Sequence, residues 1–295
     1  MTAFAEIARK LDADDPLSDA DALDLASTQD LVGLAELADR ARRRRHGTQT
    51  TFVRVAEVSL AGPLPDLPGD AGEWCLRGAP ATLESAQARV QQLVARAGEV
   101  PVSAFSLADL EALAADEGLS LRALLERLRE AGLELVAEAP VDDLQDARAS
   151  IEAANMSGLT VARLTFGGEP RGSFVRALRD VAALQRQVGV LRVFQPLPRA
   201  VVAGQPTTGY ADVRQVALAR LLVDNIDTIQ VDWLVYGPKL AQVALTAGAD
   251  DLDRVPPAAG PVPEGRRNPR DEVRWNIEAT GQQPVERNGR FDLLG

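Results

Sequence analysis

The residues of this sequence best suited to bind a small molecule are polar side chains that follow apolar segments. Glu169, Gln195 and Lys239 each come shortly after a segment that we expect to be a strand, and Tyr236 ends the last of these segments. In a barrel of parallel strands, functional groups lie on the loops after the carboxyl ends of the strands. A carboxylate, an amide, a hydroxyl and an ammonium around one opening predict a pocket for a polar small molecule. The neighbouring glycines and prolines are equally typical of plain turns, so that alternative stays open.

Other kinds of catalytic site find little support in the residue types. His46 is the only histidine and Cys75 the only cysteine, so a single chain cannot build a Cys/His zinc site or an internal disulfide. The sequence has no G-x-S-x-G motif and no glycine-rich phosphate-binding string of the G-x-G-x-x-G or G-x4-G-K-[ST] type. Three pairs of adjacent acids are better explained by helix starts and turns, because neighbouring side chains point apart. These pairs are Asp14 and Asp15, Asp142 and Asp143, and Asp250 and Asp251.

Composition limits the kinds of partner. The formal net charge of −11 argues against nucleic acid, whose binding requires clustered cations. The run from Arg42 to Arg45 ends a predicted helix, where cations interact favourably with the helix dipole; a phosphate-binding patch is the alternative. No run of about 18 apolar residues occurs, and the first ten residues lack the apolar stretch of a signal peptide, so we expect a cytoplasmic protein that does not contact membranes.

The order of predicted elements indicates an α/β fold. Strands alternate with helices of 10 to 15 residues, which predicts a parallel (β/α) barrel of the TIM type, or a partial barrel. We expect N-terminal helices in residues 1–48, the barrel core in 49–253, and a Pro/Gly-rich loop with a last helix in 254–295, all in one structural domain. The expected strands are 50–60, 101–105, 134–137, 159–166, 190–194 and 229–236, and the expected helices of the core and tail are 83–97, 107–116, 121–131, 145–157, 174–187, 212–224 and 270–279.

A segment near the C-terminus resembles a known enzyme family. Residues 207–253 read TTGYADVRQVALARLLVDNIDTIQVDWLVYGPKLAQVALTAGADDLD. This string is similar to a region of dehypoxanthine futalosine cyclase and aminofutalosine synthase, radical S-adenosylmethionine enzymes of menaquinone biosynthesis, and more loosely to deazaflavin cofactor synthase subunits. Residues 284–288 resemble the closing P-x-x-R-[DN] motif of these enzymes. The residues that carry the resemblance are Thr208, Gly209, Asp212, Arg214, Arg220, Asp224, Asn225, Trp233, Gln242 and Arg287.

The departures from that family fall where its members do chemistry. After their first strand the enzymes carry C-x3-C-x2-C, whose three thiolates hold a [4Fe–4S] cluster for S-adenosylmethionine. Here residues 58–64 read VSLAGPL, and Cys75 alone cannot replace three ligands. Four further family elements are altered at 102–105, at 136–140, at Gly168 and at 198–201. We therefore expect that the chain binds neither a [4Fe–4S] cluster nor S-adenosylmethionine and that it carries out no radical chemistry.

Three functions remain after this comparison. The favoured one is a non-catalytic paralogue that binds and stabilises or regulates a protein partner, either an active family member or another enzyme of menaquinone biosynthesis. The second is a nucleoside- or aromatic-acid-binding protein that uses Glu169, Gln195, Tyr236 and Lys239, and the third is a non-radical enzyme on the same barrel. Several motif residues have a structural interpretation as well, as buried ion pairs that fix helices and strands: Asp212, Arg214, Arg220 and Asp224.

Overall fold

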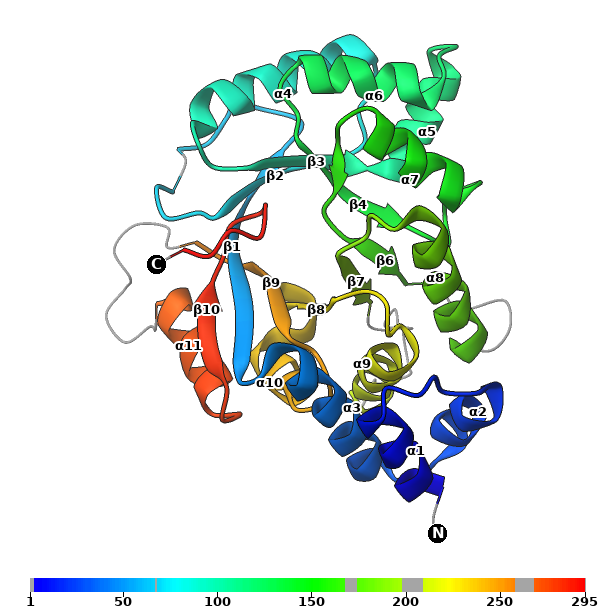
Figure 1. The fold of residues 1–295 in the computed structure, drawn as a ribbon. Helices are drawn as coiled ribbons and strands as arrows, with labels where there is room; N and C mark the ends of the chain where they lie inside the picture. The colour runs from blue at the N-terminus through cyan, green and yellow to red at the C-terminus, as the bar shows by residue number, and fades with distance from the viewer. Residues whose placement is uncertain (1–2, 67, 168–173, 198–208, 258–267, 295) are drawn as a thin grey trace, which may run out of the picture.

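The chain folds into a closed barrel of parallel strands surrounded by helices (Figure 1). The computed structural model describes residues 3–66, 68–167, 174–197, 209–257 and 268–294. Eight strands follow one another around the barrel, and β1 pairs with β9 to close it. They are β1 (Gln49–Ser59), β2 (Glu73–Arg77), β3 (Val102–Ser106), β4 (Leu135–Pro140), β6 (Leu164–Phe166), β7 (Val193–Pro196), β8 (Thr228–Asp232) and β9 (Asp251–Val255). The TIM-type α/β fold predicted from the sequence is confirmed.

Two short strands extend this sheet. β5 (Thr160–Val161) pairs with β4 just before β6 does, so the expected strand 159–166 is interrupted around Arg163. β10 (Gln283–Glu286) lies parallel to the first half of β1. The last residues therefore return to the barrel wall instead of ending with a helix.

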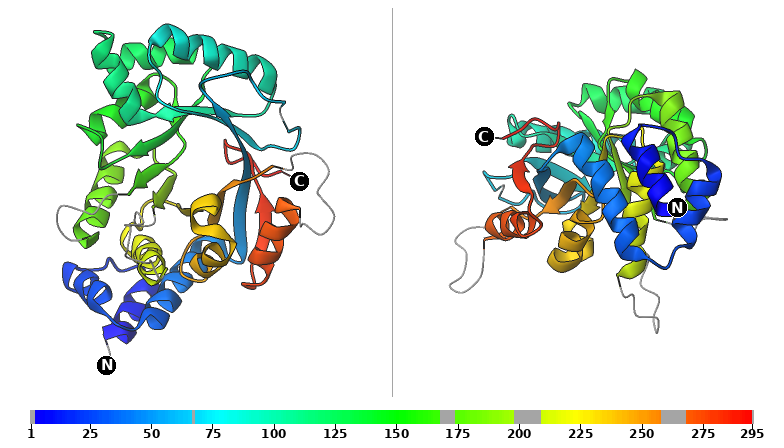
Figure 2. Two further views of the ribbon diagram at one scale, coloured as in Figure 1. Left: turned by 180° about the vertical axis from the view of Figure 1, so that it is seen from behind. Right: turned by 60° about the horizontal axis from the view of Figure 1, so that its bottom comes forward.

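Helices cover the outside of the barrel between successive strands (Figure 2). Most have amphipathic sequences with the apolar face against the strands, whereas α9 is buried on nearly all sides because α3 also packs against it. They are α4 (Leu83–Ala97), α5 (Leu107–Asp116), α6 (Leu121–Glu130), α7 (Ala147–Met156), α8 (Phe174–Val188), α9 (Tyr210–Leu222), α10 (Trp233–Leu245) and α11 (Pro269–Glu278). In the described part of the chain, no helix has the length and apolar character needed to cross a membrane.

The N-terminal helices α1 (Ala3–Asp12), α2 (Asp19–Ser27) and α3 (Leu31–His46) pack beside α8 and α9. Ser18 and Asp21 form a capping box at the start of α2. Lys10 Nζ lies 2.7 Å from the same Asp21 carboxylate, which ties α1 to α2. The hydrogen bond from Lys10, and then those from Ser18, lower the pKa of Asp21 to about 2.

Two sequence predictions about strands were wrong. The strand expected at 229–236 ends at Asp232, because the Asp232 carboxylate accepts hydrogen bonds from the backbone N–H groups of Leu234 (2.8 Å) and Val235 (3.0 Å) and starts α10 there. Trp233 is thus a helix residue. Strand β2, which pairs with β1 and β3, was missed.

Candidate functional site

The interior of the barrel is charged where TIM barrels are usually filled by aliphatic side chains. Arg163 is 5% exposed, and its Nη2 lies 3.1 Å from Glu73 Oε1 while Nη1 contacts the Asp253 carboxylate. Ser103 Oγ donates a hydrogen bond of 2.5 Å to the same Glu73 oxygen. Burial raises the pKa of Asp253 to about 6, against the attraction of Arg163. β2, β3, β9 and the junction of β5 and β6 thus share one buried polar cluster.

A second set of charges lies nearer the carboxyl ends of the strands. Arg254 bridges two acids, with Nη1 2.7 Å from Asp232 Oδ2 and Nη2 2.8 Å from Glu57 Oε1. Arg77 Nε lies 3.5 Å from the same Glu57 oxygen. Arg254 has a φ of +55°, a conformation that L-residues rarely adopt. These ion pairs link the ends of β1, β2, β8 and β9 across the barrel mouth.

A small hollow of about 180 Å³ opens beside this network, at the ends of β2, β3 and β4. Arg77 and Glu138 line it, together with Ser106 and Asp109 at the start of α5. Burial raises the pKa of Asp109. The hollow can accept a small polar group by donating from Arg77 and accepting at the carboxylates.

Cys75 lies inside the barrel on β2, where it pairs in register with Glu57 of β1. It is 2% exposed and clusters with Val53, Val55 and Ala137. Burial raises the pKa of its thiol to about 11, so it remains a neutral thiol at physiological pH. Among the described residues, no three His, Cys, Asp or Glu side chains are arranged to hold a metal ion.

The four predicted ligand-binding residues occupy different environments. Gln195 is buried on β7, and Tyr236 is buried on α10 with its hydroxyl donating to the Pro196 carbonyl at 3.2 Å. Burial raises the pKa of Tyr236, so the hydroxyl keeps its proton. Lys239 is exposed on α10, and Glu169 lies outside the described residues. The structure brings the Tyr236 hydroxyl to Pro196, the residue after Gln195 at the end of β7, and it places Lys239 on the surface.

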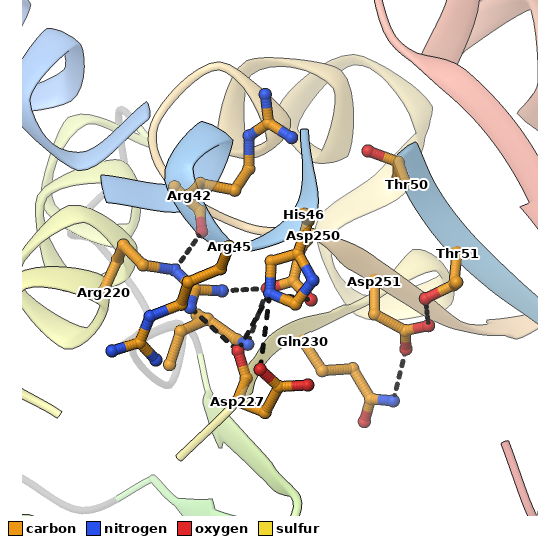
Figure 3. Close-up of polar contacts among 12 residues, drawn as sticks. Arg42, Arg45, His46, Thr50, Thr51, Arg220, Asp227, Gln230, Asp250 and Asp251 are labelled. Atoms are coloured by element: carbon orange, nitrogen blue, oxygen red, sulfur yellow. Dashed lines mark hydrogen bonds and ion pairs between the residues drawn. The ribbon is translucent and has the colours of Figure 1, made fainter. Parts of the chain in front are cut away.

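Arg220 is a structural cation at the outer side of the barrel (Figure 3). Its guanidinium is buried, contacts the Asp250 carboxylate, and donates to the carbonyls of Gly248 (2.8 Å) and Asp227 (2.9 Å). Asp250 Oδ1 also accepts the N–H of Ile229 at 2.8 Å. The interpretation of Arg220 as a buried ion pair is confirmed.

Arg287 plays a comparable role inside the barrel. Two of its nitrogens lie 2.7 and 2.6 Å from the two carboxylate oxygens of Asp251. Thr51 and Gln230 hydrogen-bond to the same carboxylate, as Figure 3 shows. Although burial alone would raise it, the pair with Arg287 holds the pKa of Asp251 below its usual value. The adjacent acids Asp250 and Asp251 thus point to opposite sides of the chain at the start of β9 and form buried ion pairs, whereas the sequence favoured a helix start or a turn for them.

The other motif residues hold helices and loops in place. Arg214 donates to the carbonyl of Thr28 at 2.7 Å, and Asn225 Nδ2 donates to the carbonyl of Ala182 at 2.8 Å. Gly209 starts α9 with a φ of +74°, and its Cα faces Leu240 so closely that a Cβ would lie 2.9 Å from that side chain. The remaining motif residues divide by exposure: Asp212 and Trp233 are buried, Gln242 is half-buried, Asp224 is exposed, and Thr208 lies outside the described residues.

The arginine run at the end of α3 docks that helix onto the barrel. Arg42 is 1% exposed, with Nε 2.9 Å from Asp39 Oδ1. Arg45 donates to the carbonyls of Asp224 and Ile226, in the loop before β8. His46 Nε2 lies 3.4 Å from Asp250. The expected helix end is present, but much of its charge is used in internal contacts.

Sequence reasoning missed the buried cluster of Glu73, Arg163 and Asp253. A signal for it was available in β9, where Asp251 and Asp253 alternate with Leu252 and Arg254. Alternate residues of a strand share one face, so this spacing places two acids inside the barrel.

Comparison with known proteins agrees with this architecture. Residues 197–292 match the family described as the CofH/MqnC C-terminal region. The chain is 28% identical over 244 residues to aminodeoxyfutalosine synthase of Streptomyces coelicolor, covering 70% of this chain and 63% of that enzyme. It is 28% identical to the Thermus thermophilus enzyme of the same name, covering 97% and 94% of the two chains.

A second group of relatives bears a different name. The chain is 27% identical to 5-amino-6-(D-ribitylamino)uracil–L-tyrosine 4-hydroxyphenyl transferase of Methanoculleus marisnigri, over 80% of this chain and 81% of that one. Because the chain spans less than two thirds of the Streptomyces enzyme, a shared activity does not follow from the alignments.

Solved structures support the fold. Methylornithine synthase superposes with a TM-score of 0.64 at 14% identity, covering 94% of this chain and 97% of that one. The hydrogenase maturase HydG of Carboxydothermus hydrogenoformans gives 0.64 at 12% identity, covering 95% and 79%. The resemblance found in the sequence is therefore confirmed: the chain is a relative of the radical S-adenosylmethionine enzymes of menaquinone and cofactor synthesis.

Proposed function

We propose that this chain is a non-catalytic relative of those enzymes, and that it acts in the cytoplasm by binding and stabilising a partner enzyme of menaquinone biosynthesis. The observation that carries the proposal is the placement of the single cysteine. Cys75 is buried on β2 inside the barrel, whereas the segment after β1 where the family holds its cluster reads VSLAGPL.

The donor set at this end of the barrel does not fit a [4Fe–4S] cluster. A cluster of the family's kind needs three thiolates, and residues 58–64 offer only one side-chain oxygen, that of Ser59. The charged side chains at this end of the barrel bind one another, since Arg254 pairs with Glu57 and Asp232. Among the described residues at the mouth, Arg254 thus has two carboxylate partners within the protein, which supports a scaffold role.

The first test is iron and acid-labile sulfide analysis after anaerobic purification and reconstitution. We expect the chain to contain no more iron than its Cys75→Ser variant. Stoichiometric binding of about four irons per chain by the unmodified protein would overturn the non-catalytic proposal.

The second test addresses the partner. We expect the tagged chain, co-expressed with a cysteine-containing family member from the same organism, to elute with it in a stable stoichiometric complex by light scattering. Elution of both as separate species, together with unchanged thermal stability of the enzyme, would contradict the partner role while leaving the iron result intact.

The hollow beside Arg77 and Glu138 favours a second candidate, a small-molecule-binding protein. Its volume of about 180 Å³ is below the ~300–1,000 Å³ typical of pockets for drug-sized ligands, so it suits a small polar acid better than a whole nucleoside. Thermal shift with aromatic acids and futalosine-type nucleosides tests this, because a ligand at 100 times its Kd adds about 2.7 kcal/mol. A shift that persists in Arg77→Gln would place the ligand elsewhere.

A further inference from the structure

A larger hollow lies at the opposite end of the barrel, where the strands begin. Its volume is about 470 Å³, within the range of ~300–1,000 Å³ that small-molecule sites occupy. The end of α6, the starts of β4 and β5, the residues before β7 and the C-terminal segment after β10 enclose it. The polar and aromatic residues that line it include Arg129, Glu134, Thr160, Arg192, Arg290 and Phe291.

The charges around this hollow do not cancel. Arg290 Nε and Nη2 lie 2.7 and 3.0 Å from the two oxygens of Glu134, and these hydrogen bonds lower the pKa of Glu134. The charge of Arg129 also lowers the pKa of Glu134, although it makes no ion pair with that carboxylate. Arg129 and Arg192 form no ion pair with any carboxylate of the described residues. Two guanidinium groups are therefore available in a chain whose net charge is −11.

The helix ends nearby reduce this positive charge without cancelling it. Arg129 is in the last turn of α6, and Gly158 follows the end of α7, so both helices turn their carbonyl ends toward the hollow. Each carbonyl end carries about half a negative charge. Three arginines, one carboxylate and two helix ends together leave roughly one positive charge.

One of the two available arginines is held in position by stacking. The guanidinium carbon of Arg192 lies 4.2 Å from the centre of the Phe291 ring, and that of Arg287 lies 3.6 Å from the same centre. Arg287 is itself fixed by its two contacts with Asp251. Such stacking limits the motion of the Arg192 side chain, which lowers the entropy lost when it binds an anion.

We propose that this hollow is a binding site for a phosphate-bearing small molecule, held by Arg129 and Arg192. The planar guanidinium fork matches two phosphate oxygens at once, and arginine keeps its charge at every physiological pH. Because Gly289, Arg290 and Phe291 line the hollow, the bound molecule also stabilises the C-terminal segment against the barrel. This site is separate from the mouth and does not depend on the proposed function.

Titration calorimetry with inorganic phosphate and pyrophosphate tests the site. We expect binding to weaken roughly tenfold or more in Arg129→Gln and in Arg192→Gln, since each removes a charge-assisted hydrogen-bonding group. The matched control is Arg122→Gln, on the same helix but paired with Glu126 at 2.8 Å, which should bind as the unmodified chain does. Equal affinity in all three variants, or no binding of either anion to the unmodified chain, overturns the proposal.

Hydrogen exchange of the C-terminal segment gives an independent measurement. We expect pyrophosphate to slow amide exchange in residues 287–293 of the unmodified chain and of Arg122→Gln, but not of Arg192→Gln. Sulfate at equal ionic strength should act more weakly than pyrophosphate. Uniform slowing across the chain would mean a general salt effect and no phosphate site. The same conclusion would follow if sulfate or acetate slowed exchange in residues 287–293 as much as pyrophosphate does.

Discussion

Replacing Arg220 with methionine tests whether this motif residue is structural. Methionine keeps much of the length of the side chain and removes its charge, leaving Asp250 buried with the N–H of Ile229 and with His46 as its remaining contacts. Removing one partner of a buried ion pair costs about 3–5 kcal/mol, because the other charge stays uncompensated. The entropy of unfolding at ~2.1 cal/mol/K per residue is about 0.6 kcal/mol/K for 295 residues, so the Tm should fall by roughly 5–8 °C.

The controls separate charge from packing. Arg43→Met removes an arginine whose side chain is 61% exposed and pairs with Asp39 on the same helix, so its cost should stay below about 1 kcal/mol. Adding Asp250→Asn to Arg220→Met removes the uncompensated carboxylate and should recover part of the lost Tm. Thermal unfolding followed by circular dichroism measures all of these variants.

The pH dependence of the Arg220→Met deficit has a definite sign. Burial already raises the pKa of Asp250, and loss of its cation raises it further. A group with a raised folded pKa contributes stability that is fully present below its unfolded value, near 3.8, and lost as pH rises through the folded pKa. The variant should therefore be closest to the unmodified protein in acid and furthest from it at neutral pH. A deficit independent of pH, or a double variant no more stable than the single one, would refute the uncompensated-charge explanation.

Three further predictions concern buried positions. The Cys75 thiol, whose pKa burial raises to about 11, should react with a disulfide reagent only when the protein unfolds; rapid reaction of the native chain would contradict its burial. Asp253 has a pKa raised from 3.8 to about 6, which is worth on the order of 3 kcal/mol at ~1.4 kcal/mol per pH unit. This contribution is present below about pH 4 and is lost as pH rises through 6, so urea unfolding of Asp253→Asn should be less pH-dependent over that interval. Gly248→Ala should destabilise the chain by about 2 kcal/mol or more in the same assay, because φ is +107° and the new Cβ would lie 2.8 Å from Arg220 Cβ; an unchanged urea midpoint would contradict this close packing.

Alternation of strands and helices was enough to predict the barrel, and the two failures have separate causes. β2 (Glu73–Arg77) follows a Pro/Gly-rich loop and turns Glu73, Cys75 and Arg77 to one face. The barrel interior here is polar, so this strand lacks the apolar run that marks a buried parallel strand. At the end of β8 the apolar pattern continues past Asp232 into α10, and only the capping contacts of that carboxylate reveal the change.

The candidate site could be predicted only in part, because its members meet through barrel closure. Arg163 contacts Glu73 and Asp253, which are each 90 positions away along the chain. Nothing local in the sequence specifies such partners. The motif residues were easier, since Arg220 lies on one face of a predicted helix among apolar neighbours, where a lone cation implies a buried acid.

The contrast between the two ends of the barrel bears on what this chain has retained. Buried charges cost several kcal/mol each unless they are paired, so a barrel that lacks cluster ligands must satisfy its remaining polar groups from within. Arg254 does this at the mouth by bridging Glu57 and Asp232, and Arg163 does it deeper inside. At the other end Arg129 and Arg192 form no ion pair with a carboxylate of the described residues, and both are exposed to water. Stability thus does not require their charges, which makes the two arginines the substitutions most able to separate ligand binding from folding.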